Sequence, residues 1–246
     1  MTYDLQNRTA LVTGAGSGIG AATAAALAAA GARVALVGRR ADRLATVAAE
    51  TGGAYAVADV TDRAGLETAV ADLRREVGPF DLVVANAGTM LAAPFDAADP
   101  SEWDRMIATN VTGLLSTARA AINDLSAAAQ EGPADLVLIS SIGADVVMPG
   151  YAVYFATKAA VTHLTTNLRA EFGPRGVRVR AIEPGMTASE LGHDMADQQA
   201  QESLRQLVAE IPPISAAAIG DAVVWSSALP VNVNVASMIV LPTVQG

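Results

Sequence analysis

Several residue types that carry common protein chemistries are absent or rare in this chain. There is no cysteine, which excludes disulfide bonds, thiolate nucleophiles and cysteine-based zinc sites. The only two histidines, His163 and His193, lie 30 positions apart. We therefore expect no metal site, and we find no candidate Ser-His-acid triad.

Positive charge is also in short supply. Sixteen Lys and Arg residues face 25 Asp and Glu residues, for a net charge of -9, which argues against binding to nucleic acid or to an anionic membrane. The most apolar stretch, residues 21–37, is interrupted by Gly31 and Arg33 and indicates a buried helix and strand, not a membrane span. Residues 1–9 are polar and unlike a signal peptide. We expect a cytoplasmic protein.

Lysine itself is almost missing. Fifteen of the sixteen basic residues are Arg, and Lys158 is the single Lys. An ammonium is a compact point charge with three donors, whereas a guanidinium is planar and rigid. Unless the pattern is chance, Lys158 has a task that Arg cannot perform.

Strand-like and helix-like segments alternate along the chain. Strands are expected at residues 9–13, 33–37, 54–58, 81–85, 135–140, 178–183 and 238–241, and helices at 18–30, 41–51, 63–77, 101–129, 152–172, 197–210 and 216–229. The strands are almost uniformly apolar, which is typical of a parallel sheet covered on both faces. The sequence predicts an α/β fold: a single Rossmann-type, doubly wound parallel sheet of about seven strands, with helices on both faces, in one domain spanning residues 1–246.

The first strand runs into a glycine-rich turn that opens a helix. The turn residues that could contact a dinucleotide are Gly14, Gly16, Ser17, Gly18, Ile19 and Gly20. Missing side chains let the backbone approach a pyrophosphate at the positive helix end. The spacing differs from Gly-x-Gly-x-x-Gly, and a packing turn is the alternative, but the βαβ context favours a dinucleotide site.

The second strand ends without a carboxylate. An NAD-preferring site usually carries an acid there, whereas this chain has Arg39 and Arg40. A guanidinium can pair with a 2′-phosphate, so NADP(H) is the preferred cofactor and NAD(H) a possible one. The alternative is that both side chains are solvated charges.

Small and polar residues follow the next two strands. Asp59 and Val60 follow the third strand, where a carboxylate could bond the adenine amino group. Asn86, Ala87 and Gly88 follow the fourth, where the backbone could lie against the cofactor. Ordinary loop chemistry is the alternative for both.

A candidate catalytic centre lies between residues 110 and 158. Tyr154 and Lys158 share one helix face, and the ammonium should lower the pKa of the phenol, making it a proton donor or acceptor. Ser141, at the end of the fifth strand, could bond the substrate oxygen. Asn110 lies in the long helix 101–129, where it either anchors a water in a proton relay or has a structural role.

The sixth strand is followed by residues that could hold the reactive end of the cofactor. Pro184 and Gly185 would form a wall, and Thr187 and Ser189 offer hydroxyls to the carboxamide or the phosphates.

Together these motifs resemble the short-chain dehydrogenase/reductase family over essentially the whole chain. They are Thr13-Gly14-x-x-x-Gly18-Ile19-Gly20, Asp59, Asn86-Ala87-Gly88, Asn110, Ser141, Tyr154-x-x-x-Lys158 and Pro184-Gly185. The resemblance implies NAD(P)H chemistry and a homotetramer or homodimer built on the helices at 101–129 and 152–172. Residues 182–187 and 233–243 look more specifically like the clavulanate-type aldehyde reductase and serine-dehydrogenase-like branch, although Val240 replaces a basic residue common there.

The expected substrate is a small or medium apolar aldehyde, ketone or secondary alcohol. The predicted wall consists of Met90, Leu91, Ala144, Val146, Met148, Met186, Leu191 and Met195, and the polar, weakly capped segment 188–210 is predicted to be a mobile lid. Two alternatives stay open. A reductase of 3-oxoacyl thioesters would need a basic docking patch, for which Arg105 and Arg119 are the candidates. A noncatalytic redox sensor would have no need of Tyr154.

Overall fold

Seven parallel strands form one sheet in the computed structural model, which describes residues 3–245. The strands are β1 (Thr9–Thr13), β2 (Arg33–Gly38), β3 (Ala54–Val57), β4 (Leu82–Ala85), β5 (Ala134–Ile139), β6 (Val177–Pro184) and β7 (Ser237–Val240). Their spatial order is β3-β2-β1-β4-β5-β6-β7. The order reverses between β1 and β4, which places the switch point of the sheet there. The predicted fold class is confirmed.

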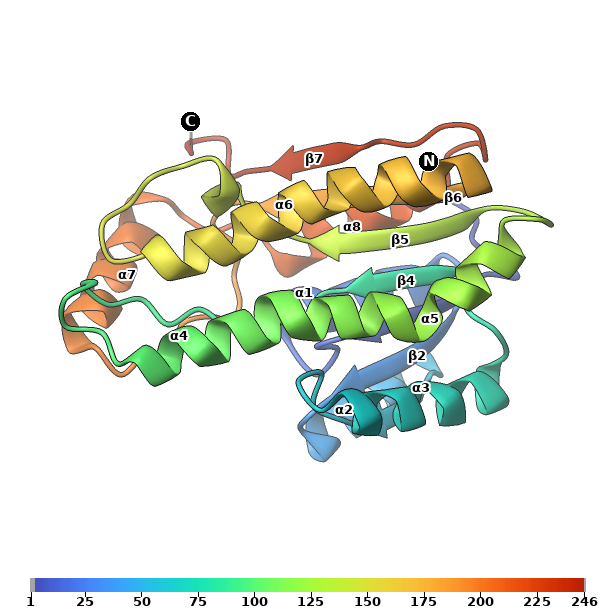
Figure 1. Ribbon diagram of the computed structural model, residues 1–246, viewed down its shortest axis with the longest axis horizontal. Helices are drawn as coiled ribbons and strands as arrows, with labels where there is room; N and C mark the ends of the chain where they lie inside the picture. The colour runs from blue at the N-terminus through green and yellow to red at the C-terminus, as the bar shows by residue number, and fades with distance from the viewer. Residues whose placement is uncertain (1–2, 246) are drawn as a thin grey trace.

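Helices cover both faces of the sheet (Figure 1). They are α1 (Gly18–Ala29), α2 (Ala41–Thr51), α3 (Arg63–Val77), α4 (Pro100–Ile107), α5 (Leu114–Ala128), α6 (Ala152–Phe172), α7 (Gln198–Glu210) and α8 (Ala216–Ser227). One core cluster joins the sheet to α3, α5 and α6, and a second joins the other face to α1, α2 and α8. Every residue of β1, β4, β5 and β6 is buried, as expected for strands covered on both sides.

The helix expected over residues 101–129 is not continuous. Between α4 and α5 the chain forms a π-helical segment, Ala108–Gly113. Wide turns of this kind are frequent at functional sites. Here the segment contains Asn110, whose side chain is bonded to Thr89 and Thr157 on neighbouring elements. Apolar periodicity cannot reveal such a turn, because it depends on partners distant in sequence.

The amino ends of the strands enclose a buried ion network. The Asp135 carboxylate, fully buried at the start of β5, accepts hydrogen bonds from Arg8, Arg178 and Arg180. Arg8 Nε also donates to Asp81 Oδ1 at 2.7 Å. Of the polar side-chain atoms in this network, only Arg178 Nε lacks a partner within residues 3–245. The network joins β1, β4, β5 and β6 at the edge opposite the site described below.

Candidate active site

A cavity of about 870 Å³ opens at the carboxyl ends of the strands, the left end of the sheet in Figure 1. Its walls come from the loops after β1 to β6, the start of α6 and the segment around α7. Every catalytic or cofactor-contacting residue predicted from the sequence lines this cavity except Gly20 and Asn110. The structure therefore brings together residues spread over nearly the whole chain.

The glycine-rich turn after β1 has no room for side chains. Gly14 has φ +66°, and a Cβ there would lie 2.8 Å from Asn86 Nδ2. A Cβ on Gly20 would collide with the Gly14 carbonyl oxygen. Asn86 Nδ2 donates to Thr13 O at 3.0 Å, so Asn86 holds the turn in place. The result is an exposed backbone cradle at the start of α1, suited to a pyrophosphate.

Basic side chains flank the far end of this cradle. Arg39 Nη1 lies 3.8 Å from Asp59 Oδ2, and the Arg39 side chain is 71% exposed. Arg40 donates to Ser17 Oγ at 2.7 Å and to Glu190 Oε2 at 2.8 Å. The Asp59 carboxylate also accepts from Thr61 N and Oγ1, so part of its hydrogen-bonding capacity serves the local turn. The Arg39 guanidinium remains accessible to an anionic ligand.

Tyr154, Lys158 and Ser141 form the innermost polar group of the cavity. Lys158 Nζ donates to Ile139 O at 3.1 Å and lies 5.8 Å from the centre of the Tyr154 ring. Both side chains are buried. Ser141 Oγ accepts from Gly143 N at 3.0 Å, which fixes the hydroxyl at the end of β5. Neighbouring Ser140 instead bonds Lys158 O and Thr162 Oγ1, joining α6 to the sheet.

Burial dominates the proton affinities of this group. Desolvation raises the pKa of Tyr154 to about 12, although its hydrogen bond with Ser141 lowers it. Desolvation also lowers the pKa of Lys158 to about 8. The expectation that the ammonium lowers the pKa of the phenol does not hold for the protein's own groups, because desolvation dominates and the opposing contribution comes from Ser141 and not from Lys158. Tyr154 is therefore protonated at neutral pH.

Asn110 reaches this centre only indirectly. Its Oδ1 accepts from Thr89 N at 2.8 Å, and its Nδ2 donates to Thr89 O at 2.9 Å and to Thr157 Oγ1 at 3.0 Å. Thr157 Oγ1 in turn donates to Tyr154 O at 2.7 Å. The amide thus joins the loop after β4 to the helix of Tyr154, with both of its N–H groups already used.

The loop after β6 completes the cavity floor. Thr187 Oγ1 donates to Gly185 O at 3.0 Å. Gln245 Oε1, near the C-terminus, accepts from Met186 N at 2.8 Å, and Gln245 lines the cavity. Sequence reasoning missed Gln245, since nothing in its local pattern marks it.

The segment after this loop lies across the cavity. A Cβ on Gly18 would lie 3.1 Å from Ser189 Cβ, Glu190 pairs with Arg40 and Arg43, and Asp194 pairs with Arg105 at 2.9 Å. The pKa of Glu190 is lowered by its hydrogen bond and attraction to Arg40. Asp197 caps α7 by accepting from Ala200 N at 2.7 Å, so this helix begins with a stronger cap than expected.

The substrate end is more polar than predicted. Five members of the predicted wall line it: Met90, Val146, Met148, Met186 and Leu191. Leu91, Ala144 and Met195 do not line it, and Leu91 and Met195 lie in the packed cluster behind it. Sequence reasoning missed the lining residues Tyr151, Phe155 and Leu204. It considered Arg105 only for a docking patch and gave no role to His193, which also lines the cavity. The aromatic pair could have been suspected from its proximity to Tyr154.

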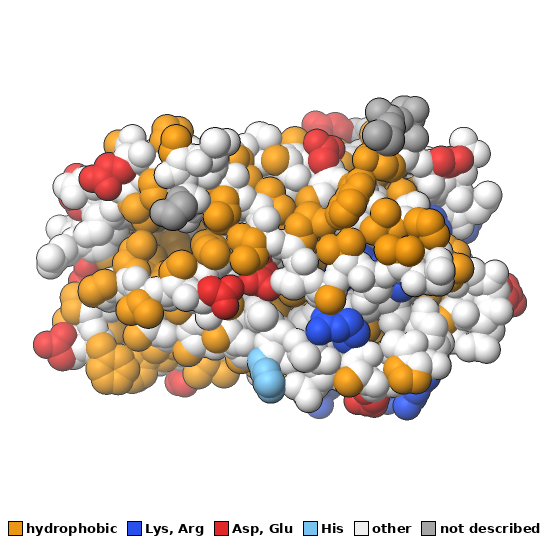
Figure 2. Space-filling view, turned by 90° about the horizontal axis from the view of Figure 1, so that it is seen from above, with side chains coloured by type: hydrophobic (Ala, Val, Ile, Leu, Met, Phe, Trp, Pro, Cys, Tyr) orange, Lys and Arg blue, Asp and Glu red, His pale blue; other side chains and the backbone are white. Residues whose placement is uncertain are grey.

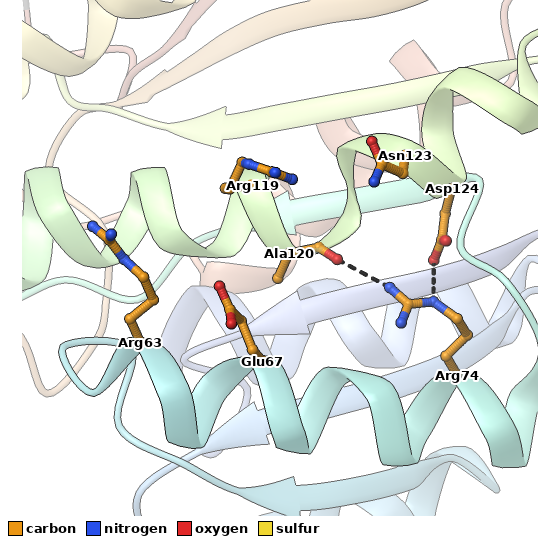
Figure 3. Close-up of a pocket in the computed structure, with 7 residues that line it drawn as sticks. All are labelled: Arg63, Glu67, Arg74, Arg119, Ala120, Asn123 and Asp124. Carbon is orange, nitrogen blue, oxygen red and sulfur yellow. Dashed lines mark hydrogen bonds and ion pairs between the residues drawn. The ribbon is translucent and has the colours of Figure 1, made fainter.

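A second cleft lies between α3 and α5 (Figure 3). It is lined by Arg63, Glu67, Arg74, Arg119, Ala120, Asn123 and Asp124. Arg74 donates to Asp124 Oδ2 and Ala120 O, which joins the two helices. The cleft carries charges of both signs, and none of the predicted catalytic or cofactor-binding residues lines it. We assign no chemistry to this cleft.

Two negative findings limit the range of sites. Among residues 3–245, no group of three or more His, Asp or Glu side chains is arranged to hold a metal ion. Within the same range, no helix is sufficiently long and apolar to cross a membrane.

The chain matches a known sequence family. Residues 8–200 match the family model described as short chain dehydrogenase, and the chain belongs to this family of oxidoreductases. Serine 3-dehydrogenase from Agrobacterium fabrum (strain C58) is 36% identical over 242 residues, covering 96% of this chain and 94% of the relative. Gluconate 5-dehydrogenase from Gluconobacter oxydans is 34% identical over 196 residues, covering 77% and 75%.

Solved structures agree with this assignment. The closed form of serine dehydrogenase complexed with NADP+ has a TM-score of 0.89 and 30% identity, covering 97% of this chain and 96% of that one. A gluconate 5-dehydrogenase from Burkholderia cenocepacia in complex with NADP and tartrate has a TM-score of 0.85 and 28% identity, covering 99% and 97%. The family predicted from the motifs is confirmed.

Proposed function

We propose that this protein is an NADP(H)-dependent oxidoreductase that interconverts a small or medium aldehyde or ketone and the corresponding alcohol. The observation that carries the proposal is the burial of Tyr154 and Lys158, one helical turn apart, in the same cavity as the glycine-rich cradle. An acid-base pair and a dinucleotide cradle in one cavity suit hydride transfer coupled to proton transfer.

NADPH, when bound, supplies the hydride for the carbonyl carbon. Tyr154, which is protonated at neutral pH because its pKa is raised to about 12, donates its phenolic proton to the carbonyl oxygen. Ser141 donates a hydrogen bond to the same oxygen as negative charge develops. Lys158 uses one N–H for Ile139 O, which leaves two for the cofactor ribose and for stabilising the phenolate. In the reverse direction the phenolate accepts the alcohol proton.

Asn110 is a positioning residue in this scheme. Its side chain holds Thr89 and, through Thr157, the backbone of Tyr154. Since both amide N–H groups are bonded to protein, we propose that any relay water is bound by other atoms of this region.

The preference for NADP(H) is supported by Arg39 and Arg40 and by the absence of a carboxylate at the end of β2. The solved relatives with bound NADP point the same way. Asp59 and Val60 would then lie at the adenine, and the backbone of residues 86–88 against the cofactor. Pro184 and Gly185 would form the wall against the nicotinamide, with Thr187 and Ser189 at the carboxamide or the phosphates.

Segment 188–210 is proposed to be a lid over the bound substrate. The contacts across the cavity support this role: Glu190 pairs with Arg40 and Arg43 at the cofactor end, and Asp194 pairs with Arg105 at the substrate end. Exposed ion pairs of this kind are weak and reversible, which suits a closing segment.

The two alternative functions, a 3-oxoacyl-thioester reductase and a noncatalytic redox sensor, have less support from the site. A carrier-protein substrate called for a basic patch at the cavity mouth, but Arg105 is paired with Asp194 and Arg119 lines the separate α3–α5 cleft. A noncatalytic sensor would have no use for a buried phenol and ammonium, whose desolvation costs free energy.

Assembly as a homotetramer or homodimer through the helices around residues 101–129 and 152–172 remains our proposal. Exposed Ile107 and Leu115 lie on α4 and α5. The outer edge of β7 is a further apolar surface: Val231, Val233 and Ile239 are exposed there, and Figure 2 shows hydrophobic side chains spread over this side. Light scattering of the purified protein would measure the oligomer size.

The deciding experiment is a panel of carbonyl compounds assayed with NADPH and NADH, followed by the absorbance of the reduced cofactor. We expect turnover with NADPH that disappears in Tyr154→Phe while NADP+ still binds. No turnover of any compound with either cofactor, or full turnover in the variant, would contradict the proposal.

A further inference from the structure

One buried hydroxyl in the cavity wall has no partner. Tyr151, three residues before Tyr154, is only 6% exposed, and its hydroxyl finds no hydrogen-bond partner within residues 3–245. Burial alone raises the pKa of this phenol, so the group is a neutral donor. A buried donor without an acceptor costs free energy, and most buried side-chain polar groups are satisfied.

The ring of Tyr151 is firmly held. It stacks on Phe155 with ring centres 5.5 Å apart, and Phe155 itself packs against Gly143, where a Cβ would overlap the Phe155 ring. The backbone of Tyr151 bonds Met148 O and Phe155 N. A hydroxyl on such a rigid ring cannot turn away in search of water.

Tyr151 lies at the substrate end of the cavity. Tyr151 and Tyr154 both line the cavity, and the two phenols are near enough to interact electrostatically. Tyr151 also belongs to the same packed cluster as Met195, Ala200 and Leu204 of the proposed lid. Residues of the proposed lid therefore already pack against Tyr151, on the same side of the cavity as Tyr154.

We infer that Tyr151 is a specificity-determining residue that donates a hydrogen bond to a second oxygen atom of the substrate, close to the carbonyl that Tyr154 protonates. This inference rests on the proposed function. It narrows the substrate class from apolar carbonyl compounds to those with a neighbouring hydroxyl or carbonyl group, because only such an acceptor satisfies the buried donor under the closed lid.

The charges around the cavity favour an uncharged second oxygen. The Lys and Arg residues that line the cavity are Arg39, Arg40, Arg105 and Lys158. The first two flank the cradle after β1, Lys158 serves the proton-transfer centre, and Arg105 is paired with Asp194 at the mouth. Within the described residues no unpaired cation is thus left at the substrate end to bind a carboxylate.

The kinetic test compares Tyr151→Phe with wild type on ketones of equal carbon number. Butane-2,3-dione and 3-hydroxybutan-2-one carry the second oxygen, and butan-2-one lacks it. We expect the variant to lose about tenfold or more in kcat/KM with NADPH for the first two and to keep or improve its value for butan-2-one. Equal losses on all three substrates would overturn the inference.

A melting comparison tests the same hydroxyl without any substrate, with Tyr55→Phe as a matched control at an exposed tyrosine. An unpartnered donor predicts that Tyr151→Phe melts at the same or a higher temperature than wild type. A clear drop beyond that of the control would mean that the hydroxyl is already satisfied in the folded protein, and would overturn the inference. If the wild type reduces none of the ketones, the carbonyl-reduction proposal fails for these substrates, while melting still decides the state of Tyr151.

Discussion

Buried polar groups at the amino and carboxyl ends of the strands differ in how many protein partners they have. At the amino edge, the Asp135 carboxylate accepts from three guanidinium groups. At the carboxyl edge, Lys158 has one protein acceptor and the Tyr151 hydroxyl has none. Polar groups at the first edge stabilise the fold by pairing with one another, with Arg178 Nε as the one exception among the described residues, whereas those at the second are left with capacity for a ligand. Asp135 and Lys158 are similarly buried, but the carboxylate is matched by three opposite charges and the ammonium by none.

The largest effect we expect is on activity at the carboxyl edge. Tyr154→Phe should lower kcat by about 10²- to 10⁴-fold, since it removes the proton donor. Stability should change little, because the buried hydroxyl that is lost has only its hydrogen bond with Ser141. Initial rates and thermal melts of the same preparation check both expectations, with Tyr55→Phe as control. A large loss of stability would place Tyr154 with the structural group instead.

The opposite result is expected at the amino edge. Asp135→Asn leaves three buried guanidinium groups without their counter-charge and should lower the free energy of unfolding by about 3–5 kcal/mol. Urea unfolding measures this, and Asp72→Asn, which breaks an exposed pair with Arg75 on α3, should cost far less. The folded Asp135→Asn protein should retain near wild-type KM for NADPH. A change in KM as large as that caused by a substitution in the cavity would contradict the division of the polar groups into a structural amino edge and a ligand-binding carboxyl edge.

The buried ammonium should make stability depend on pH. The pKa of Lys158 is about 8 in the folded protein against 10.5 for a solvated Lys side chain, so between these values the unfolded chain binds a proton that the folded one does not. Stability therefore rises with pH across this window, by about 3 kcal/mol in full. Tyr154 acts oppositely, because its raised pKa lets the folded state retain a proton from about pH 10 to 12.

The measurement is urea unfolding of wild type and Lys158→Met from pH 7.5 to 10. The free energy of unfolding of wild type should gain on that of the variant as pH rises. Parallel profiles would mean that Lys158 is not desolvated. They would contradict the description of its ammonium as a buried charge with a single protein acceptor.

A smaller effect is expected for cofactor choice. Arg39→Asp should shift the ratio of kcat/KM for NADPH to that for NADH by about 10- to 100-fold toward NADH, because the charge-assisted contact with a 2′-phosphate becomes repulsive. Arg75→Asp, on the exposed face of α3, is the matched control. An unchanged ratio would remove Arg39 from the cofactor site.

The smallest effect concerns the proposed lid. Glu190→Gln weakens the pairs with Arg40 and Arg43, and we expect only a few-fold change in KM for NADPH, with a weaker dependence on salt than in wild type. Stopped-flow binding at two salt concentrations would measure it. If salt affects the variant and wild type equally, these ion pairs do not hold the segment.

Much of the fold could be predicted from pattern alone. The apolar strands and the alternating helices, with the glycine-rich turn between residues 13 and 20, determined the parallel sheet and the family. The long helix at 101–129 was wrong in detail because its π-helical segment coincides with the partners of Asn110, Thr89 and Thr157, which are far away in sequence. Site residues in dense motifs were easy to identify, whereas Gln245 and Tyr151 were not, since single residues without a motif give no local signal.

The fold class, the family and the order of the polar residues along the strand ends follow from periodicity and glycine spacing, which are local properties of the chain. The direction of the Tyr154 pKa shift, the lack of a partner for the Tyr151 hydroxyl and the pairing of Glu190 and Asp194 across the cavity depend on the folded arrangement. Desolvation and hydrogen-bond satisfaction arise from atoms that come together from distant parts of the chain.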